Sequence, residues 1–302
     1  MKNIPLTPKG PVFSRIVAGV MKWGAWGHQL NTAQMLRLME QCVELGVTTF
    51  DHADIYGHYT TEAEFGAALQ GQPALRQQIQ IVTKCGIQMI TPNRPQHAIK
   101  SYDTSIEHIL WSVEQSLKNL RTDYLDLLLL HRPDFLLHPD DVASVFTQLQ
   151  KEGKVLHFGV SNFTPPQFEL LHTRFPLVTN QIEASLLHLQ PFTDGTLDQA
   201  LRHGCRPMAW SPLGGGAFFA QQKDERIKRV QEVANRLAAK RSGATLDQIL
   251  IAWLLLHPAG ILPVLGTANI ERVKAAVAAL PIALTREEWY ELWQASTGKE
   301  VA

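Results

Sequence analysis

The stretch GVTTFDHADIYGHYTTE (residues 46–62) places polar side chains directly after a short apolar strand. Gly46–Phe50 predicts this strand because it is apolar and rich in β-branched residues. Asp51, Asp54 and Tyr56 follow at its carboxyl end, and a helix is expected near Glu62. In barrels of alternating strands and helices, active sites are built at the carboxyl ends of the strands. The stretch therefore predicts chemistry at one rim of such a barrel.

The rest of the chain repeats this alternation of strands and helices. Short apolar runs predict eight strands, at Ile16–Val20, Val47–Asp51, Ile79–Thr83, Leu125–Leu130, Val155–Val160, Leu177–Gln181, Arg206–Trp210 and Ile261–Leu265. Apolar residues with helical spacing lie between them, for example Leu36, Met39 and Val43 before the second strand. Such alternation favours a parallel sheet with helical crossovers, and eight strands close a barrel. We therefore predict an α/β protein with the (β/α)8 TIM-barrel fold.

Segments outside the eight repeats predict additions to the barrel. Ile4–Lys9 and Pro11–Arg15 predict an N-terminal β-hairpin. Ile270–Leu280 and Arg286–Ser296 predict two closing helices, the second of them an extra C-terminal helix. No linker or low-complexity segment interrupts residues 1–302, so we expect a single domain. An open, doubly wound sheet is the alternative fold, but the residues GVMKWG after the first strand lack its GxGxxG motif.

Composition and charge restrict the class of protein. The 302 residues are 45% hydrophobic, and 28 basic residues balance 28 acidic ones, so nothing points to a nucleic-acid or membrane-surface partner. Cys42, Cys85 and Cys205 form neither a disulfide framework nor a zinc site, and they fit a reducing compartment. The N-terminus lacks the apolar core of a signal peptide, and the longest apolar run, Ile249–Leu256, is too short to span a bilayer. We expect a cytoplasmic protein and, although the sequence does not give the oligomeric state, a monomer.

Four titratable side chains stand at the ends of neighbouring predicted strands. The second strand delivers Asp51 and Tyr56, the third delivers Lys84, and the fourth delivers His131. An ammonium beside a phenol lowers the pKa of the phenol, a carboxylate keeps that ammonium charged, and a histidine can orient a carbonyl oxygen. Such a set suits protonation of an oxygen that gains negative charge when hydride attacks a carbonyl. Each residue alone has an ordinary structural explanation, but four at corresponding positions favour a catalytic role.

The order and spacing of several motifs resemble those of the aldo-keto reductases along nearly the whole chain. The motifs are DHADIYG (51–57), VTK (82–84), LDLLLLH (125–131), GVSNF (159–163), NQIE (180–183), WSPLGGG (210–216) and VLGT followed by ERV (264–273). More narrowly, the chain is similar to bacterial members known only as oxidoreductases. The resemblance implies that Tyr56 is the proton donor, that Lys84 and Asp51 tune it, and that His131 binds and orients the carbonyl. It also implies NADPH-dependent reduction of aldehydes or ketones to alcohols, with a small-molecule carbonyl compound as the substrate.

The later strands are expected to hold the nicotinamide cofactor. The resemblance implies that Ser161, Asn162 and Gln181 hold the carboxamide, and an aromatic residue usually stacks on the nicotinamide ring where Trp210 stands. The glycine-rich loop after Trp210 could approach a pyrophosphate with its backbone, and the helix after Thr267 offers N-terminal amides to phosphate. The further residues expected at the cofactor are Gly19, Val20, Met21, Asp51, Ser211, Pro212, Leu213, Gly214, Gly215, Gly216, Gly266, Thr267 and Arg272.

Arg272 bears on the choice between NADPH and NADH. It resembles the family arginine that grips the 2′-phosphate of NADPH, a role that suits a planar guanidinium. Some relatives have lysine in place of Gly266 and asparagine in place of Ala276. We expect NADP(H) as the cofactor, and NAD(H) remains the alternative.

The substrate side is defined less well by the sequence. Met21 and Trp23, together with Tyr56 and His131, are expected to line the pocket, which would favour apolar or aromatic carbonyl compounds. Trp23 has an equally good alternative role in packing the barrel rim. Three long loops, 86–104, 132–139 and 214–224, each follow a predicted strand, where binding specificity usually resides.

Two functions of other classes compete with catalysis by carbonyl reduction. One is a regulatory subunit that binds the cofactor without turnover, but the chain shows no added interaction domain or charged tail. The other is a metal-dependent barrel hydrolase. The first strand offers no metal ligand in GVMKWG, and His52 and His58 belong to no clear ligand set. The regulatory subunit remains the alternative function, and we expect no metal site.

Overall fold

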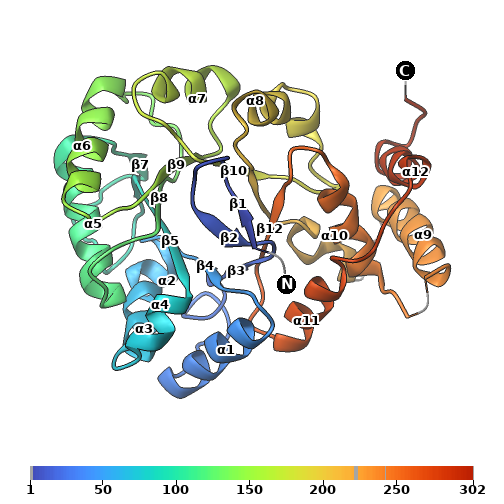
Figure 1. Ribbon diagram of the computed structural model, residues 1–302, viewed down its shortest axis with the longest axis horizontal. Coiled ribbons are helices and arrows are strands. Elements are labelled where there is room, and N and C mark those ends of the chain that lie inside the picture. Colours follow the sequence, from blue (N-terminus) through green and yellow to red (C-terminus); the bar gives the residue numbers. More distant parts are fainter. Residues whose placement is uncertain (1–2, 221–223, 242, 302) are drawn as a thin grey trace.

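A closed barrel of eight parallel strands forms the centre of the molecule, which a computed structural model describes over residues 3–220, 224–241 and 243–301 (Figure 1). The barrel strands are β3 (Val17–Gly19), β4 (Thr49–Asp51), β5 (Gln80–Cys85), β8 (Leu127–Leu130), β9 (Phe158–Ser161), β10 (Asn180–Glu183), β11 (Met208–Trp210) and β12 (Leu262–Leu265). Neighbours in the barrel follow the order of the chain, and β12 pairs with β3 to close it. The predicted TIM-barrel fold is confirmed.

Helices surround the barrel and shield its outer face (Figure 1). They are α1 (Thr32–Glu44), α3 (Thr61–Leu69), α4 (Pro73–Gln78), α5 (Ile106–Leu120), α6 (Pro139–Lys151), α7 (Pro165–His172), α8 (Thr196–His203), α10 (Leu246–Leu256) and α11 (Ile270–Ala278). Outside this ring, α9 (Glu225–Ala239) packs against α12 (Arg286–Thr297), the expected extra C-terminal helix. The short elements are α2 (Tyr56–Tyr59) and the 3₁₀ helices η1 (Gln190–Phe192) and η2 (Gly214–Phe219). None of the described helices has the length and apolar character needed to cross a membrane.

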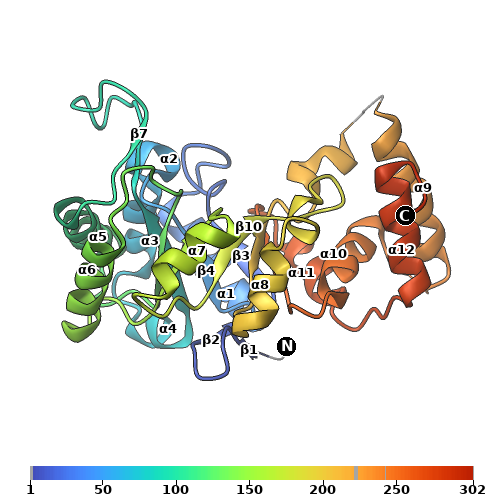
Figure 2. The ribbon, with the colours of Figure 1, turned by 90° about the horizontal axis from the view of Figure 1, so that it is seen from above.

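Two hairpins lie on opposite faces of the barrel (Figure 2). The expected N-terminal hairpin, β1 (Asn3–Pro5) with β2 (Val12–Ser14), covers the face that carries the amino ends of the strands. Its loop residue Leu6 and its strand residue Phe13 are fully buried with interior residues of the barrel. Burial of side chains this large contributes roughly 1.5–3 kcal/mol each. The second hairpin, β6 (Ile87–Gln88) with β7 (Ser101–Tyr102), belongs to loop 86–104 on the opposite face.

The four leucines of β8 show why the strand sequences are continuously apolar. Leu127 and Leu129 join the cluster inside the barrel, whereas Leu128 and Leu130 join the larger core between barrel and helices. A strand buried on both faces has no position for a polar residue until it ends. The first polar residue after β8 is His131, which lies at the rim.

Local sequence signals fix where several helices begin. Asn31 and Gln34 form a reciprocal capping box at the start of α1, with distances of 2.9 and 3.0 Å between backbone nitrogens and side-chain oxygens. Thr285 and Glu288 do the same for α12. Such caps give a partner to backbone N–H groups that have none within the helix.

The main differences from the predicted elements lie at the amino ends of the strands. The ladders of β4 and β8 begin at Thr49 and Leu127, two residues after the predicted starts Val47 and Leu125. Both earlier residues are fully buried, and Leu125 makes only an isolated bridge to Val155. Apolar residues thus continue beyond the ladder into buried loop. Residues 221–223 of the predicted loop 214–224 lie outside the described residues, and the single domain over residues 1–302 stays a prediction.

Candidate active site

The buried Lys84 ammonium is the centre of the candidate catalytic group. Its Nζ lies 2.8 Å from Asp51 Oδ2, 2.6 Å from the backbone oxygen of His52 and 3.3 Å from the Tyr56 hydroxyl. The barrel register explains this meeting, because Asp51 pairs with Val82, two residues before Lys84 on β5. Three oxygen partners satisfy the three donors of an ammonium. The structure therefore brings together three of the four residues predicted to be catalytic.

Lys84 remains charged although its side chain has no exposed surface. Burial acts to lower the pKa of Lys84, but Asp51 and then Tyr56 raise it above its ordinary value overall. A buried ammonium of this kind is stable only when it is paired. The Asp51–Lys84 ion pair thus provides a fixed positive charge beside the phenol.

Burial dominates the acidity of Tyr56. It raises the pKa of the phenol above 10, while the neighbouring Lys84 lowers it by a smaller amount. Lys84 lowers the pKa of Tyr56, as predicted. The predicted net lowering of this pKa is wrong, because the pKa is raised overall. The sequence did not reveal how fully the phenol is buried, and desolvation disfavours the phenolate. Tyr56 is therefore a protonated donor at neutral pH.

His131 completes the group on the other side of the phenol. Its ring centroid lies 6.2 Å from that of Tyr56, and the backbone N–H of His131 donates to the carbonyl of Cys85. Burial first, and then the charges of Lys84, Arg132 and Lys100, hold the pKa of His131 well below its usual value. The imidazole is therefore neutral, and its Nδ1 has no hydrogen-bond partner among the described residues. A neutral imidazole can donate one hydrogen bond to a carbonyl oxygen.

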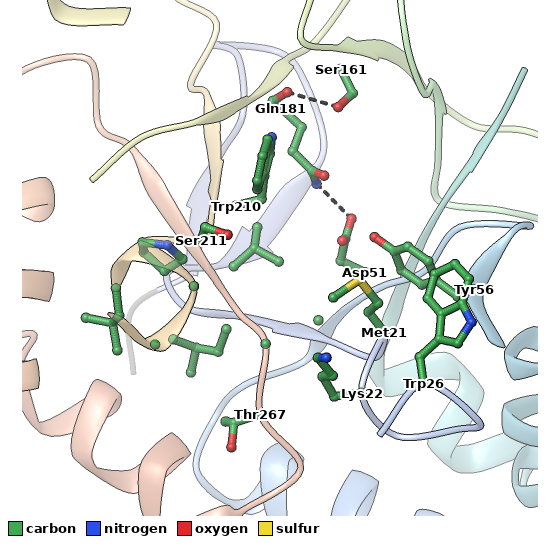
Figure 3. A pocket seen from close by; sticks show the side chains of 18 of the residues that line it. Met21, Lys22, Trp26, Asp51, Tyr56, Ser161, Gln181, Trp210, Ser211 and Thr267 are labelled. Carbon is green, nitrogen blue, oxygen red and sulfur yellow. Dashed lines mark hydrogen bonds between the residues drawn. The ribbon is translucent and has the colours of Figure 1, made fainter. Parts of the chain in front are cut away.

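A chain of hydrogen bonds links the catalytic group to the predicted cofactor half (Figure 3). Gln181 Nε2 donates to Asp51 Oδ1 at 2.8 Å, and the Ser161 hydroxyl donates to the backbone oxygen of Gln181 at 3.1 Å. Asn162 donates to Ser161 Oγ at 2.7 Å and accepts from the Trp210 indole at 3.0 Å. Asp51 thus orients both Lys84 and Gln181, and Asn162 fixes the plane of Trp210.

Strained backbone accompanies several of these residues. Six non-glycine residues have positive φ in the described part of the chain, and four of them border the site: His58, Tyr59, Asn162 and Ser211. Residues in this conformation persist only where the surroundings hold them, and they cluster at functional sites. Asn162 and Ser211 follow the ends of β9 and β11, where they turn the chain away from the barrel rim.

A cavity of about 670 Å³ extends from Tyr56 across the barrel mouth to α11. The predicted residues that line it are Gly19, Met21, Asp51, Tyr56, His131, Ser161, Gln181, Trp210, Ser211, Pro212, Leu213, Gly215, Gly216, Gly266, Thr267 and Arg272. Val20, Lys84, Asn162 and Gly214 do not line it but adjoin residues that do. The carboxyl ends of separate strands thus contribute to one continuous space.

The predicted position of Trp23 in the pocket is corrected by the structure. Trp23 is fully buried against Phe50 and Phe65, and its indole donates to the backbone oxygen of Thr267 at 3.0 Å. The alternative role in packing the rim therefore applies. Trp26, three residues later, lines the cavity instead, with its ring 6.0 Å from that of Tyr56.

Several polar lining residues were not predicted. They are Lys22, Lys100, Tyr102, Arg132 and Asp247. Arg132 carried a usable signal, because it directly follows His131 at the end of β8. Lys100 and Tyr102 come from the far end of loop 86–104, and the β6–β7 pairing helps to bring that end back to the rim.

Known proteins resemble this chain along nearly its whole length. A model of the aldo/keto reductase family matches residues 15–296. The chain belongs to the aldo/keto reductase family. Its match covers every strand of the barrel and all four candidate catalytic residues.

Individual aldo/keto reductases and oxidoreductases match over nearly the full length. The uncharacterized oxidoreductase YcsN of Bacillus subtilis is 46% identical over 291 residues, with 96% of each chain covered. A 6-dehydroglucose reductase of Agrobacterium fabrum is 43% identical over 304 residues, with both chains fully covered. Among solved structures, the thermostable aldo-keto reductase Tm1743, in complex with the inhibitor epalrestat, has a TM-score of 0.81 at 26% identity. That match covers 98% of this chain and 100% of the other.

Aldo/keto reductases use nicotinamide cofactors, and the residues of this chain fit such a group. A Cβ at Gly215, Gly216 or Gly266 would meet no atom within 4 Å, so the cavity has open space where backbone could approach a pyrophosphate. A Cβ at Gly19 would lie 2.8 Å from the backbone oxygen of Leu265 and 3.2 Å from Val264 Cγ1, so this part of the cavity lining has no room for a side chain. Arg272 has no carboxylate within 4 Å among the described residues. Its charge therefore remains available to a phosphate.

The metal-hydrolase alternative lacks a candidate site in the described part of the chain. No group of three or more His, Cys, Asp or Glu side chains there could hold a metal ion. His52, one of the two histidines beside the candidate catalytic residues, is buried with its ring 4.3 Å from that of Phe65. His58 packs its ring against Trp26.

Proposed function

We propose that the chain is an NADPH-dependent reductase that converts an aldehyde or ketone to an alcohol, with Tyr56 as the proton donor. The observation that carries this proposal is the Tyr56 hydroxyl, 3.3 Å from the buried Lys84 ammonium and open to the same cavity as Gln181 and Trp210. A proton donor and a candidate nicotinamide site thus share one enclosed space. Family membership supports the class of reaction.

Each residue of the catalytic group has a distinct role in the proposed reaction. When bound, NADPH would supply a hydride to the carbonyl carbon. The carbonyl oxygen accepts hydrogen bonds from Tyr56 and from neutral His131, which orient it and stabilise its growing negative charge. Tyr56 then gives up its proton to that oxygen, and the fixed charge of Lys84 stabilises the phenolate that remains. Asp51 keeps Lys84 charged and in place.

The proposed cofactor contacts follow the hydrogen-bond chain. Gln181 has its amide nitrogen bound to Asp51, so its amide oxygen would be the atom that accepts from the carboxamide. Trp210, fixed by Asn162, offers its flat face to the nicotinamide ring. Arg272 at the start of α11 would bind the 2′-phosphate, which favours NADPH, with NADH as the alternative.

We infer a hydroxylated carbonyl compound as the substrate, in place of the apolar one expected from the sequence. Lys100, Tyr102 and Arg132 line the cavity together with Tyr56 and His131, and their donors can bind hydroxyl groups that an apolar compound lacks. The 6-dehydroglucose reductase among the relatives acts, by its name, on a hydroxylated aldehyde. This agreement supports the same substrate class here.

A panel of substrates tests the proposal. NADPH consumption would be followed with 6-dehydroglucose and with benzaldehyde, an apolar aldehyde without hydroxyl groups. We expect kcat/KM for the hydroxylated aldehyde to exceed that for benzaldehyde by roughly 100-fold or more, because only the hydroxylated compound can bind the donors of the cavity. An equal kcat/KM for both would contradict the substrate class, and no turnover of either would contradict the reductase proposal.

A further inference from the structure

The backbone directly after Tyr56 is held in an unfavourable conformation. Gly57, His58 and Tyr59 have successive φ values of +60°, +59° and +70°. Glycine tolerates this region, but a residue with a Cβ in it costs about 1–2 kcal/mol. Two such residues in a row do not persist unless other contacts hold them. We call residues 57–59 the left-handed turn.

Loop 86–104, which we call the cap loop, supplies those contacts through Tyr59. The Tyr59 hydroxyl donates to the backbone oxygen of Ile87 at 3.1 Å and accepts from the backbone N–H of Met89 at 3.0 Å. The Arg94 guanidinium lies 4.5 Å from the centre of the Tyr59 ring, and the His97 ring meets it edge-on at 6.2 Å. The hydroxyl and the ring of Tyr59 are therefore both in contact with the cap loop.

A second contact joins the cap loop to the turn at a different point. Asn93 Nδ2 donates to the backbone oxygen of His58 at 2.7 Å. The His58 ring in turn packs edge-on against Trp26, with centroids 5.3 Å apart. The turn is thus connected to two loops that form the mouth of the cavity.

The cap loop also forms the wall of the cavity opposite the cofactor half. Its residues Ile87, Met89, Lys100 and Tyr102 line the cavity. Ile87 packs with Ala53 and Ile55 in a small apolar cluster that also contacts Tyr56 and Tyr59, separate from the main core. A change in the position of the cap loop must therefore alter the surroundings of the Tyr56 phenol.

We propose that Tyr59 is a positioning residue, which holds the cap loop and the left-handed turn together and thereby sets the place of the Tyr56 hydroxyl. This role rests on the proposed function of Tyr56 as proton donor. Without the Tyr59 hydroxyl, the Ile87 carbonyl and the Met89 N–H lose their partner, and the turn is free to relax toward ordinary dihedral angles. A shift of about 1 Å in a reacting group can reduce turnover by roughly 100-fold.

The variant Tyr59→Phe tests this proposal because it removes only the hydroxyl. Tyr290→Phe is the matched control, since Tyr290 is exposed on α12, remote from the cavity. We expect Tyr59→Phe to lower kcat for carbonyl reduction at least about tenfold while the Kd for NADPH changes less than about twofold. We also expect faster amide hydrogen exchange in both 56–60 and 86–104, and no change in α9 or α12. Asn93→Ala, a change at an exposed residue, should give the same pattern with a smaller effect.

The possible outcomes distinguish a failure of the positioning role of Tyr59 from a failure of the proposed reductase function. Faster exchange in both segments with a fall in kcat alone supports the positioning role. Wild-type kcat in Tyr59→Phe, faster exchange in the cap loop only, or an equal loss of NADPH affinity and turnover would overturn it. If wild-type protein reduces no carbonyl compound, the proposed function fails, and the exchange experiment still decides whether Tyr59 couples the turn to the cap loop.

Discussion

At the scale of single residues, Tyr56 experiences two opposing effects. Burial raises the pKa of the phenol and Lys84 lowers it, with burial the larger. The sequence predicted the four residues because each lies at or shortly after the carboxyl end of a predicted strand. It could not predict the net effect on Tyr56, since burial depends on the loops that cover it. For the same reason, the sequence could not predict that Trp26 lines the cavity while Trp23 is buried. The path of the loop after β3 decides which indole faces the cavity.

The first prediction concerns the charge beside the phenol. Lys84→Met should raise the pKa of Tyr56 further, because the strongest effect that lowers it is removed. It should also lower stability by about 3–5 kcal/mol, because Asp51 is left buried without a cation. Urea unfolding would give the stability, and the alkaline limb of the pH dependence of kcat/KM would give the pKa. Lys274→Met, an exposed change on α11, serves as control, and an alkaline limb that does not move upward in Lys84→Met would contradict the assignment.

The second prediction concerns the cofactor phosphate. Arg272→Gln should weaken NADPH binding by roughly 10- to 100-fold and leave NADH binding unchanged, because only NADPH has the 2′-phosphate. Quenching of protein fluorescence on titration with each cofactor measures both affinities. Arg286→Gln, on exposed α12, is the control. Equal weakening for both cofactors would show that Arg272 does not recognise the phosphate.

At the scale of elements, the strands could be predicted and the loops could not. The continuous apolar run of β8 and the polar residue that ends it place His131 at the rim, because parallel strands all end on the same side. Loop 86–104 gave no such pattern, although Lys100 and Tyr102 reach the cavity from it. Their position depends on the two short strands β6 and β7, which pair over only two residues each. Pairing this short leaves little trace in a sequence.

The third prediction tests the glycine loop after β11. Gly216→Ala and Gly153→Ala each add a methyl group at a positive φ with no atom within 4 Å, so both should lose about 1 kcal/mol of stability. Only Gly216 lines the cavity. The Kd for NADPH should therefore rise roughly tenfold in Gly216→Ala alone, because the methyl group blocks close approach of the backbone. Fluorescence titration measures it, and an unchanged Kd would place the pyrophosphate elsewhere.

At the scale of the whole molecule, the barrel buries titratable groups that make its stability depend on pH. Burial, and then Lys84, lower the pKa of His52 to about 3. Neither ring nitrogen of His52 has a hydrogen-bond partner in the described residues. The unfolded chain binds a proton here below about pH 6.5, whereas the folded chain does not until about pH 3. Stability is therefore lost as the pH falls through this range.

The fourth prediction isolates this contribution. His52→Leu removes the titrating group, so the stability of the variant relative to wild type should rise by about 1.4 kcal/mol for each pH unit below 6.5. Urea unfolding of both proteins between pH 4.5 and 7.5 gives the difference directly. His28→Leu, at an exposed position, serves as the control. A difference that does not change with pH would mean that His52 titrates in the folded protein as it does in the unfolded chain.

Two expectations about the whole molecule stay predictions. They are the monomeric state, which the sequence does not give, and the cytoplasmic location, which is inferred from the cysteines and from the absence of signal-peptide and membrane-spanning patterns in the sequence. Sedimentation of the purified protein would decide the first, and fractionation of cells that produce it would decide the second.

The most direct test of the central claim is the turnover of Tyr56→Phe with NADPH and the best carbonyl substrate. The variant keeps the aromatic ring and removes the proton donor alone. We expect kcat to fall by roughly 100-fold or more, with the Kd for NADPH essentially unchanged, because the phenol acts on the carbonyl and not on the cofactor. Full turnover in Tyr56→Phe would contradict the account.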